Sequence, residues 1–373
     1  MKKNILVAFG GVSSEHEVSI ITGLQILENI DKSIYNPIPL YITKDGLLLL
    51  IPNLKNKKAF FTEKRILCHF GKDNKGSFVQ YGSFGKKEYI YSAYLALHGG
   101  MGEGGQLQGM LECFDFAYTS PDYESSVVCM NKNIAKEILA YYDIPTVKGF
   151  AFKDMDFEKD SEKVMESIKN NIGFPAIIKP AHLGSTIGIN IANNESELSK
   201  YLSAAVQIDK EILVEEFLTD IKEFNISART INGEIQLSEI EEPIKKSNLL
   251  SFDDKYANGA KKTGGMASLD RNLPANISDA LRNEIYDLAI KTFKALRCSK
   301  LVRIDFIYSK EKLYICEVNQ IPGSMAFYLW EAKGIMFQSQ ITDLIEESIL
   351  DRDRVQKKRF SYSTDIVEKF VSA

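Results

Sequence analysis

Two strand-like stretches joined by a short turn constrain the fold of this chain most strongly. Residues 301–319 read LVRIDFIYSKEKLYICEVN, in which two β-rich runs flank a turn-forming Ser-Lys-Glu segment. This pattern predicts a β-hairpin. Because side chains i and i+2 point to one face of a strand, Arg303 lies beside Asp305 and Glu317 lies beside Asn319. A paired hairpin would therefore bring two carboxylates, an amide and a guanidinium to a common space.

The donor atoms of this hairpin indicate what it can bind. Carboxylate and amide oxygens, without His or Cys, suit Mg²⁺, which also binds substrate phosphates. A nucleotide-dependent enzyme is one interpretation. A solvated hairpin with a charged face is the other, and the hairpin alone favours that second interpretation.

Composition narrows the class of protein. A chain of 373 residues predicts two or three domains, and 45% apolar with 26% charged residues is typical of globular proteins. The net charge of −4 argues against a nucleic-acid binder, and we expect no membrane association because no apolar run reaches the length of a span. The cysteines show neither metal-ligand spacing nor a disulfide framework, which favours a reducing cytoplasm and buried, isolated thiols. They are Cys68, Cys113, Cys129, Cys298 and Cys316.

The N-terminal third predicts a doubly wound α/β unit. An apolar strand at 4–9 ends in Gly10-Gly11 and precedes a helical pattern over 20–27. Residues 53–87 are polar and basic, which predicts loops or a small excursion. Further strands are expected at 38–42 and 94–97, a helix at 106–114, and the end of this domain near residue 122.

The remaining two thirds alternate between both patterns. Asn232-Gly233 predicts a hairpin between strands at 224–230 and 234–239. Residues 247–270 have weak periodicity and many Gly, Lys and Asp residues, and a connection of this length favours a functional lid. Helices are expected at 126–142, 195–206 and 277–296, and strands at 174–180 and 212–217.

Several local motifs have both a functional and a structural explanation. The loop at 182–188 (HLGSTIG) follows a strand carrying Lys179 and has amides and hydroxyls suited to phosphate, although most such loops are only turns. It is not a Walker motif. Glu15 opens the first helix, where the helix dipole alone favours an acidic residue. His98 ends a strand, a position typical of active-site residues, yet a lone histidine is more often structural.

The order of these motifs resembles that of one known family. GGVSSEHEVS, LHGGMGEGGQLQGMLE, the Lys179 strand with GSTIG, DDKY and RIDF…EVNQIPG follow one another as in the D-alanine–D-alanine ligase family of ATP-grasp enzymes, over residues 4–350. The resemblance implies an α/β fold, α+β in the ATP-binding part, with three domains. They are a Rossmann-like parallel-sheet domain (1–122), a central ATP-grasp subdomain (123–215) and a C-terminal ATP-grasp subdomain (216–373) with the lid at 247–270.

The resemblance also implies an activity and a set of site residues. ATP phosphorylates one D-alanine, and a second D-alanine attacks the acyl phosphate to give the dipeptide for peptidoglycan. ATP would be bound by Lys132, Lys179, Glu215, Phe217, Leu218, Glu223 and Lys255. Mg²⁺ (two ions, or Mn²⁺) would be bound by Asp305, Glu317 and Asn319. Catalytic roles would belong to Glu15, Ser185, Lys255, Tyr256, Arg303 and the backbone of Gly323, and a homodimer is usual in the family.

Departures from the family pattern leave the second substrate open. The family has a small, hydroxyl-rich segment after its Pro-Gly, whereas residues 324–330 read SMAFYLW, with Tyr328 near the usual serine. This favours, as an alternative, a related ligase that uses D-serine or another amine. Gly104 and Asn131 replace acidic residues at positions that need not touch the chemistry. A non-catalytic nucleotide- or dinucleotide-binding protein is a further alternative, disfavoured by the carboxylates and the lid lysine.

Overall fold

The structure is a computed structural model, and it describes residues 2–54, 56–244, 270–358 and 363–372. A seven-stranded sheet forms the N-terminal part, with β1 (Lys3–Gly10) lying parallel between β2 (Tyr35–Ile42) and β7 (Ser92–Leu95). Residues 5–9 are buried on both faces of this central strand, as a continuous apolar run predicts. Helix α1 (His16–Asn29) follows the Gly10-Gly11 turn. The strand–turn–helix opening is therefore confirmed.

Residues 53–87 are expected to form loops or a small excursion, and the first of these two expectations is wrong. Antiparallel strands extend the sheet here in the order β6-β5-β4-β3-β2. The strands were hidden by polar side chains on a solvated face, as in Ile66–Asp73, where Cys68 and Phe70 are buried between exposed neighbours. The elements are β3 (Leu48–Leu50), the 3₁₀ turn η1 (Lys57–Phe61), β4 (Ile66–Asp73), β5 (Gly76–Tyr81) and β6 (Lys86–Tyr89). The short helices α2 (Gly100–Glu103) and α3 (Gln106–Cys113) follow β7.

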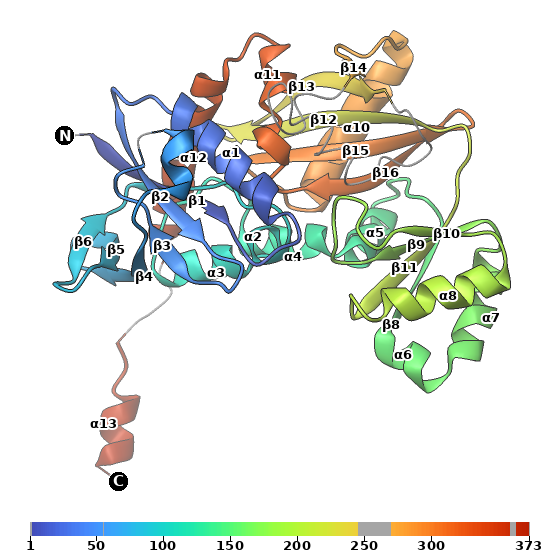
Figure 1. Cartoon of the computed structure of the whole chain (residues 1–373), viewed down its shortest axis with the longest axis horizontal. Helices are drawn as coiled ribbons and strands as arrows, with labels where there is room; N and C mark the ends of the chain where they lie inside the picture. Colours follow the sequence, from blue (N-terminus) through green and yellow to red (C-terminus); the bar gives the residue numbers. More distant parts are fainter. Residues whose placement is uncertain (1, 55, 245–269, 359–362, 373) are drawn as a thin grey trace.

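Within the described ranges, the remaining strands form two antiparallel sheets (Figure 1). The four-stranded sheet has the order β10-β9-β11-β8 and packs against α7 and α8, and the five-stranded sheet has the order β14-β13-β12-β15-β16 and packs against α10. The first comprises β8 (Gly149–Lys153), α6 (Asp154–Lys159), α7 (Ser161–Asn171), β9 (Ala176–Pro180), β10 (Asn190–Ala192), α8 (Glu195–Ala205) and β11 (Glu211–Glu216). The second comprises β12 (Lys222–Ile231), β13 (Glu234–Pro243), β14 (Arg271–Asn272), α10 (Asp279–Ala295), β15 (Leu301–Ser309) and β16 (Lys312–Asn319). The predicted hairpins and helices in this region are confirmed, while the lid falls largely on residues outside the described ranges.

The single helix expected over residues 126–142 is instead two. α4 (Tyr123–Met130) ends and α5 (Lys132–Tyr141) begins around Asn131. The Asn131 side chain accepts hydrogen bonds from the backbone N–H groups of Asn133 (2.9 Å) and Ile134 (3.1 Å). Asparagine is a favourable N-cap residue, so this departure from the family pattern caps a helix.

The C-terminal helices return to the N-terminal sheet. α11 (Phe327–Glu331) and α12 (Phe337–Gln356) follow the 3₁₀ turn η3 (Gly323–Ala326). Trp330 and Phe337 join the apolar core around β1. One core thus crosses the predicted boundaries at residues 122 and 216, and those boundaries stay a prediction.

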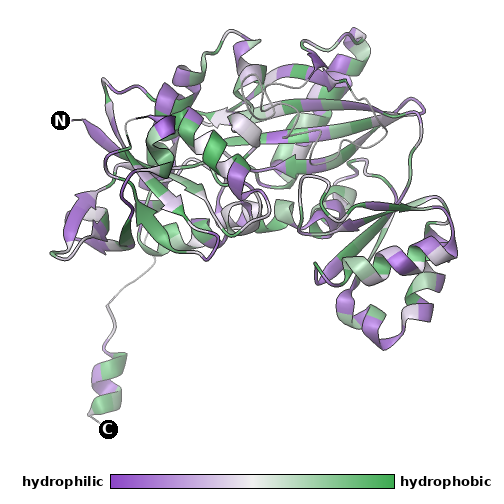
Figure 2. Ribbon diagram, viewed as in Figure 1, coloured by the Kyte–Doolittle hydropathy of each residue, from purple (hydrophilic) through white to green (hydrophobic). Residues whose placement is uncertain are grey.

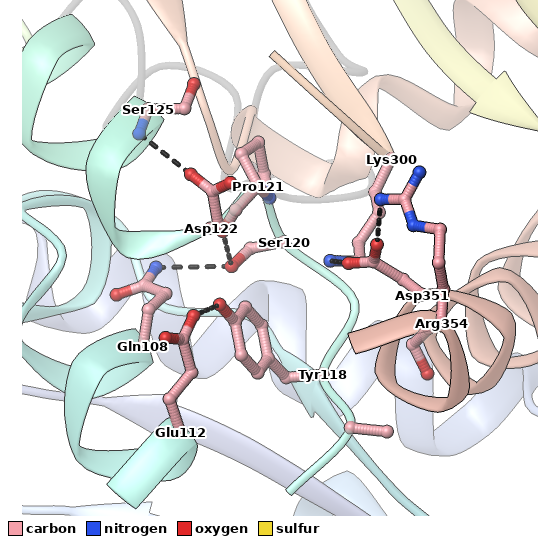
Figure 3. Close-up of polar contacts among 12 residues, drawn as sticks. Gln108, Glu112, Tyr118, Ser120, Pro121, Asp122, Ser125, Lys300, Asp351 and Arg354 are labelled. Atoms are coloured by element: carbon pink, nitrogen blue, oxygen red, sulfur yellow. Dashed lines mark hydrogen bonds and ion pairs between the residues drawn. The ribbon is translucent and has the colours of Figure 1, made fainter. Parts of the chain in front are cut away.

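Polar contacts tie this returning helix to the end of the N-terminal part (Figure 3). Lys300, which is buried, donates to Asp351 of α12 at 2.9 Å, and its ammonium lies 4.8 Å from the centre of the Tyr118 ring. Burial would raise the pKa of Asp351, but the Lys300 charge outweighs it, with a smaller contribution from Arg354, and lowers this pKa. The Asp351 carboxylate therefore stabilises the fold above its unfolded-state pKa, and this contribution is lost as the pH falls through the lower folded-state value.

Replacing Lys300 with methionine should reveal that contribution. We expect the free energy of unfolding to fall by about 1.5–3 kcal/mol at pH 7, the range for a hydrogen bond to a charged group. The difference in the free energy of unfolding between the variant and the unsubstituted protein, measured by urea unfolding, should narrow as the pH falls from 5 to 2. Arg354→Met, at a side chain that is 77% exposed, is the control and should cost less than about 1 kcal/mol. A difference that does not change with pH would contradict this account.

The surface of the molecule includes one helix with exposed apolar side chains. Figure 2 shows strands and helices that carry both apolar and polar residues, while α13 (Ile366–Val371) lies apart from the other elements with its apolar side chains exposed. Within the described ranges, no helix combines the length and the apolar character needed to cross a membrane.

The expectation of isolated, buried cysteines is only partly right. Cys113 is exposed, and the buried thiols of Cys129 and Cys298 lie 3.9 Å apart because the fold joins segments distant in sequence.

Candidate active site

The paired strands β15 and β16 bring together the side chains that the sequence placed on one face. Arg303 faces Asn319, and Asp305 faces Glu317, directly across the ladder. Arg303 Nε and Nη2 donate to the two oxygens of Asp305 at 2.6 and 2.7 Å, and Asn319 Nδ2 donates to Asp305 at 3.1 Å. Burial would lower the pKa of Arg303, but the Asp305 charge raises it well above its ordinary value. The guanidinium is thus a fixed, permanent positive charge.

A small polar cavity, of about 60 Å³, lies beside this guanidinium. Glu15, at the start of α1, accepts a hydrogen bond from Ser185 Oγ, which comes from the predicted Gly-Ser-Thr loop. Glycines leave room for the Glu15 carboxylate, because a Cβ on Gly99 or on Gly184 would lie 2.9 Å from its Oε2. Residues lining the cavity include Glu15, His98, Glu103, Lys132, Ser185, Arg303 and Gly323.

A larger cavity, of about 160 Å³, adjoins the first. Lys132, Ser185, Arg303 and Glu317 line both. The two cavities therefore meet at two positive charges, a hydroxyl and a carboxylate. Among the predicted nucleotide and metal ligands, the larger cavity is lined by Lys132, Lys179, Glu215, Phe217, Leu218, Glu223, Asp305 and Glu317.

A buried ion cluster supports the larger cavity. Glu215 on β11 pairs with Lys179 on β9 and with Lys136 on α5. Burial would raise the pKa of Glu215, but the two lysines outweigh it and lower the pKa. Lys132 Nζ donates to the Leu183 carbonyl at 2.6 Å and lies 3.8 Å from Glu317. These contacts hold two lysines of the site in place.

The structure adds residues that the sequence reasoning did not select. Lys136 follows Lys132 by four positions, so helical periodicity places both on one face of α5 and could have identified it. Glu103 is buried, and burial raises its pKa, with a smaller contribution from the Glu15 charge. It lies within the LHGGMGEGGQLQGMLE motif, but this glycine-rich run has no periodicity that would single out Glu103. Thr22, on α1, contacts His98.

His98 was a candidate by its position at a strand end, and it is buried. Its Nδ1 lies 2.7 Å from the Ile321 carbonyl, which can only accept, so the proton resides on Nδ1. Burial lowers the pKa of His98 to about 4, against the raising effect of this hydrogen bond. The imidazole is therefore neutral at pH 7.

The bulky segment after Pro322 does not place Tyr328 at the cavities. Tyr328 is 9% exposed, and its hydroxyl donates to Glu241 at 2.9 Å, while the Arg271 guanidinium lies 4.0 Å from its ring centre. Tyr328 is absent from the described residues that line either cavity. The predicted Lys255 and Tyr256 lie outside the described residues.

A parallel-sheet domain joined to two antiparallel sheets, around a cavity lined by lysines and carboxylates, is the architecture of the ATP-grasp enzymes. Family models described as D-ala D-ala ligase N-terminus and C-terminus match residues 4–121 and 138–346. The chain belongs to the D-alanine–D-alanine ligase family.

Individual relatives agree with this assignment. D-alanine–D-alanine ligases from Thermosipho melanesiensis and Thermosipho africanus are 34% and 36% identical to this chain, covering 98% and 97% of both sequences. The solved D-alanine-D-alanine ligase of Coxiella burnetii is similar with a TM-score of 0.80 and 25% identity, over 95% of this chain and 96% of that one. The VanG D-Ala:D-Ser ligase of Enterococcus faecalis is similar with a TM-score of 0.78 and 27% identity, over 93% of this chain and all of that one.

Family membership implies use of ATP with a divalent metal, and the donor atoms fit such an ion. Asp305, Glu317 and Asn319 supply hard oxygen donors from facing strand positions. The described part of the chain contains no cluster of three or more His, Cys, Asp or Glu residues suited to a metal. The amide oxygen of Asn319, water molecules and phosphate oxygens would have to complete the coordination of the ion, as is usual for Mg²⁺.

Proposed function

We propose that this protein joins two D-alanine molecules in an ATP-dependent reaction, through an acyl phosphate, to give D-alanyl-D-alanine for peptidoglycan synthesis. The observation that carries this proposal is the meeting of the two cavities at Lys132, Ser185, Arg303 and Glu317. A carboxylate in the smaller cavity can then approach a phosphate in the larger one.

The charges of the site suit the first chemical step. An anionic carboxylate must approach an anionic phosphoryl group, so positive groups have to neutralise the encounter. We assign phosphate binding to Lys132 and Lys179, and adenosine binding to the cavity residues Glu215, Phe217, Leu218 and Glu223. By the family resemblance, Lys255 would add a further positive charge.

The smaller cavity suits an amino acid. The Glu15 carboxylate, held by Ser185, would bind the ammonium of the first D-alanine. Arg303 and the backbone N–H of Gly323, which both line this cavity, would stabilise the oxyanion that forms when the second amine attacks. By the family resemblance alone, Tyr256 would extend the contact that Ser185 makes with Glu15.

The proposal includes a divalent metal held by Asp305, Glu317 and Asn319. We infer two Mg²⁺ ions, with Mn²⁺ as a substitute. When bound, such ions neutralise phosphate charge and orient the transferring group. Addition of EDTA should abolish activity, and excess Mg²⁺ should restore it.

We also propose that the protein works in the cytoplasm as a homodimer. Five cysteines without a disulfide in the structure fit a reducing compartment. The dimer rests on the habit of the family and would appear as twice the 42.0 kDa chain mass in light scattering. A monomer at assay concentrations would contradict it.

A substrate panel tests the proposed function. The protein is incubated with ATP, Mg²⁺ and D-alanine, alone or with D-serine, D-lactate or glycine, and products are identified by mass spectrometry. We expect D-alanyl-D-alanine with release of phosphate. The likeness to VanG does not favour D-serine, because identity to the two Thermosipho ligases is higher. Mixed dipeptide in excess over D-alanyl-D-alanine would support the alternative instead.

A further inference from the structure

The turn that follows β16 is held by side chains from the N-terminal sheet domain. Ile321 and Gly323 of this turn line the smaller cavity. The N–H of Ile321 donates to Glu103 Oε1 at 3.0 Å, and its carbonyl accepts from His98 Nδ1 at 2.7 Å. The N–H of Ser324 donates to Thr22 Oγ1 at 3.3 Å. Three backbone groups of the turn are thus bound from another part of the fold.

Thr22 joins two of these contacts. Because the proton of His98 resides on Nδ1, Nε2 is an acceptor, and the Thr22 hydroxyl, 2.7 Å away, donates to it. The same oxygen then accepts from Ser324. Thr22, His98 and Ser324 are 1%, 3% and 2% exposed, so water has little access to replace a lost partner.

The backbone of the turn requires such restraint. Ser324, Met325 and Ala326 have φ values of 51°, 55° and 47°, a left-handed conformation that residues other than glycine rarely adopt. Each such residue costs energy and persists only when its surroundings hold it. Gln340 adds one contact by donating to the Met325 carbonyl at 2.8 Å. The Thr22 contact lies at the cavity end of this strained segment.

We propose that Thr22 is a positioning residue, which fixes the backbone of Gly323 at the smaller cavity through its hydrogen bonds to Ser324 and His98. This inference rests on the role proposed above for Gly323. Thr22 is not among the described residues that line either cavity, so it acts through the turn rather than on a substrate. Its loss should impair the acyl-transfer step and leave the nucleotide cavity intact.

The test compares Thr22→Val with Thr22→Ser. Valine keeps the shape but removes both hydrogen bonds, whereas serine keeps the hydroxyl. We expect kcat for dipeptide formation to fall about 10- to 100-fold in Thr22→Val, since a displacement near 1 Å can cost this much. KM for ATP should stay within about 2-fold, because Thr22 is not among the described residues that line the larger cavity. Thr22→Ser should recover most of kcat.

Thr292 supplies a matched control. It is a fully buried threonine of α10 whose hydroxyl has no hydrogen-bond partner within the described part of the chain. Thr292→Val should leave both constants unchanged. If Thr22→Val does not fold, judged by its thermal midpoint, Thr22→Ala takes its place because alanine favours the helix.

The outcomes separate this inference from the proposed function. Dipeptide formation by the unsubstituted protein is measured in the same assay, and its absence would count against the function alone. A Thr22 variant without its hydroxyl that keeps the kcat of Thr22→Ser would overturn the positioning role. So would a loss of kcat matched by an equal rise in KM for ATP.

Discussion

Replacing Arg303 with lysine should lower kcat for dipeptide formation by about 10²- to 10³-fold, the usual cost of losing one preorganised oxyanion donor. Arg303 makes two parallel hydrogen bonds to Asp305 and also lines the smaller cavity, which we assign to the amino acid. A lysine ammonium is a point charge that cannot make both contacts in the same geometry. Steady-state kinetics with D-alanine and ATP provide the measurement.

The control for this prediction is Arg354→Lys, since Arg354 is largely exposed on α12. It should leave kcat unchanged. The Kd for ATP, measured by calorimetry, should differ by no more than a few-fold between Arg303→Lys and the unsubstituted protein. An Arg303→Lys variant with more than a third of the original kcat would refute the assigned role.

Replacing Glu215 with glutamine should lower the free energy of unfolding by more than replacing Lys300 with methionine does. Glutamine keeps the shape, but it leaves Lys136 and Lys179 without their shared, buried carboxylate. Breaking a buried ion pair by removing one partner costs about 3–5 kcal/mol. The free energy of unfolding from urea titration at pH 7 gives the measurement.

Glu195→Gln is the matched control for that substitution. Glu195 pairs with Lys169 at 2.9 Å, but the two side chains are 56% and 36% exposed. An exposed pair contributes less than about 1 kcal/mol. Similar losses of unfolding free energy in the two variants would contradict the expectation that burial makes the Glu215 ion pairs more costly to break.

The strand pair at residues 301–319 shows what the sequence could predict. Period-two alternation predicts which side chains share a face, and a short turn predicts which strands pair. The register then follows closely, with Asp305 opposite Glu317. Local patterns of this kind also predicted the Gly10-Gly11 turn and the hairpin at Asn232-Gly233.

Contacts between distant segments could not be predicted in this way. Thr22, His98 and Ser324 form one hydrogen-bonded chain although 302 positions separate its ends. The return of Trp330 to the first core has the same origin. The strands at 66–89 were missed for a different reason, because a solvated sheet face breaks up the apolar signal.

Transfer of oxygen from D-alanine to phosphate tests the proposed acyl phosphate most directly. The protein is incubated with ATP, Mg²⁺ and D-alanine labelled with ¹⁸O in its carboxylate. A carboxylate oxygen bonds to the γ-phosphorus while the bond from that phosphorus to ADP breaks. The amine of the second D-alanine then attacks the carbonyl carbon, loses a proton and displaces phosphate, which carries that oxygen away. We predict D-alanyl-D-alanine together with inorganic phosphate that contains one ¹⁸O per molecule. Dipeptide with unlabelled phosphate would contradict the acyl-phosphate route, and release of phosphate without dipeptide would contradict the ligase function itself.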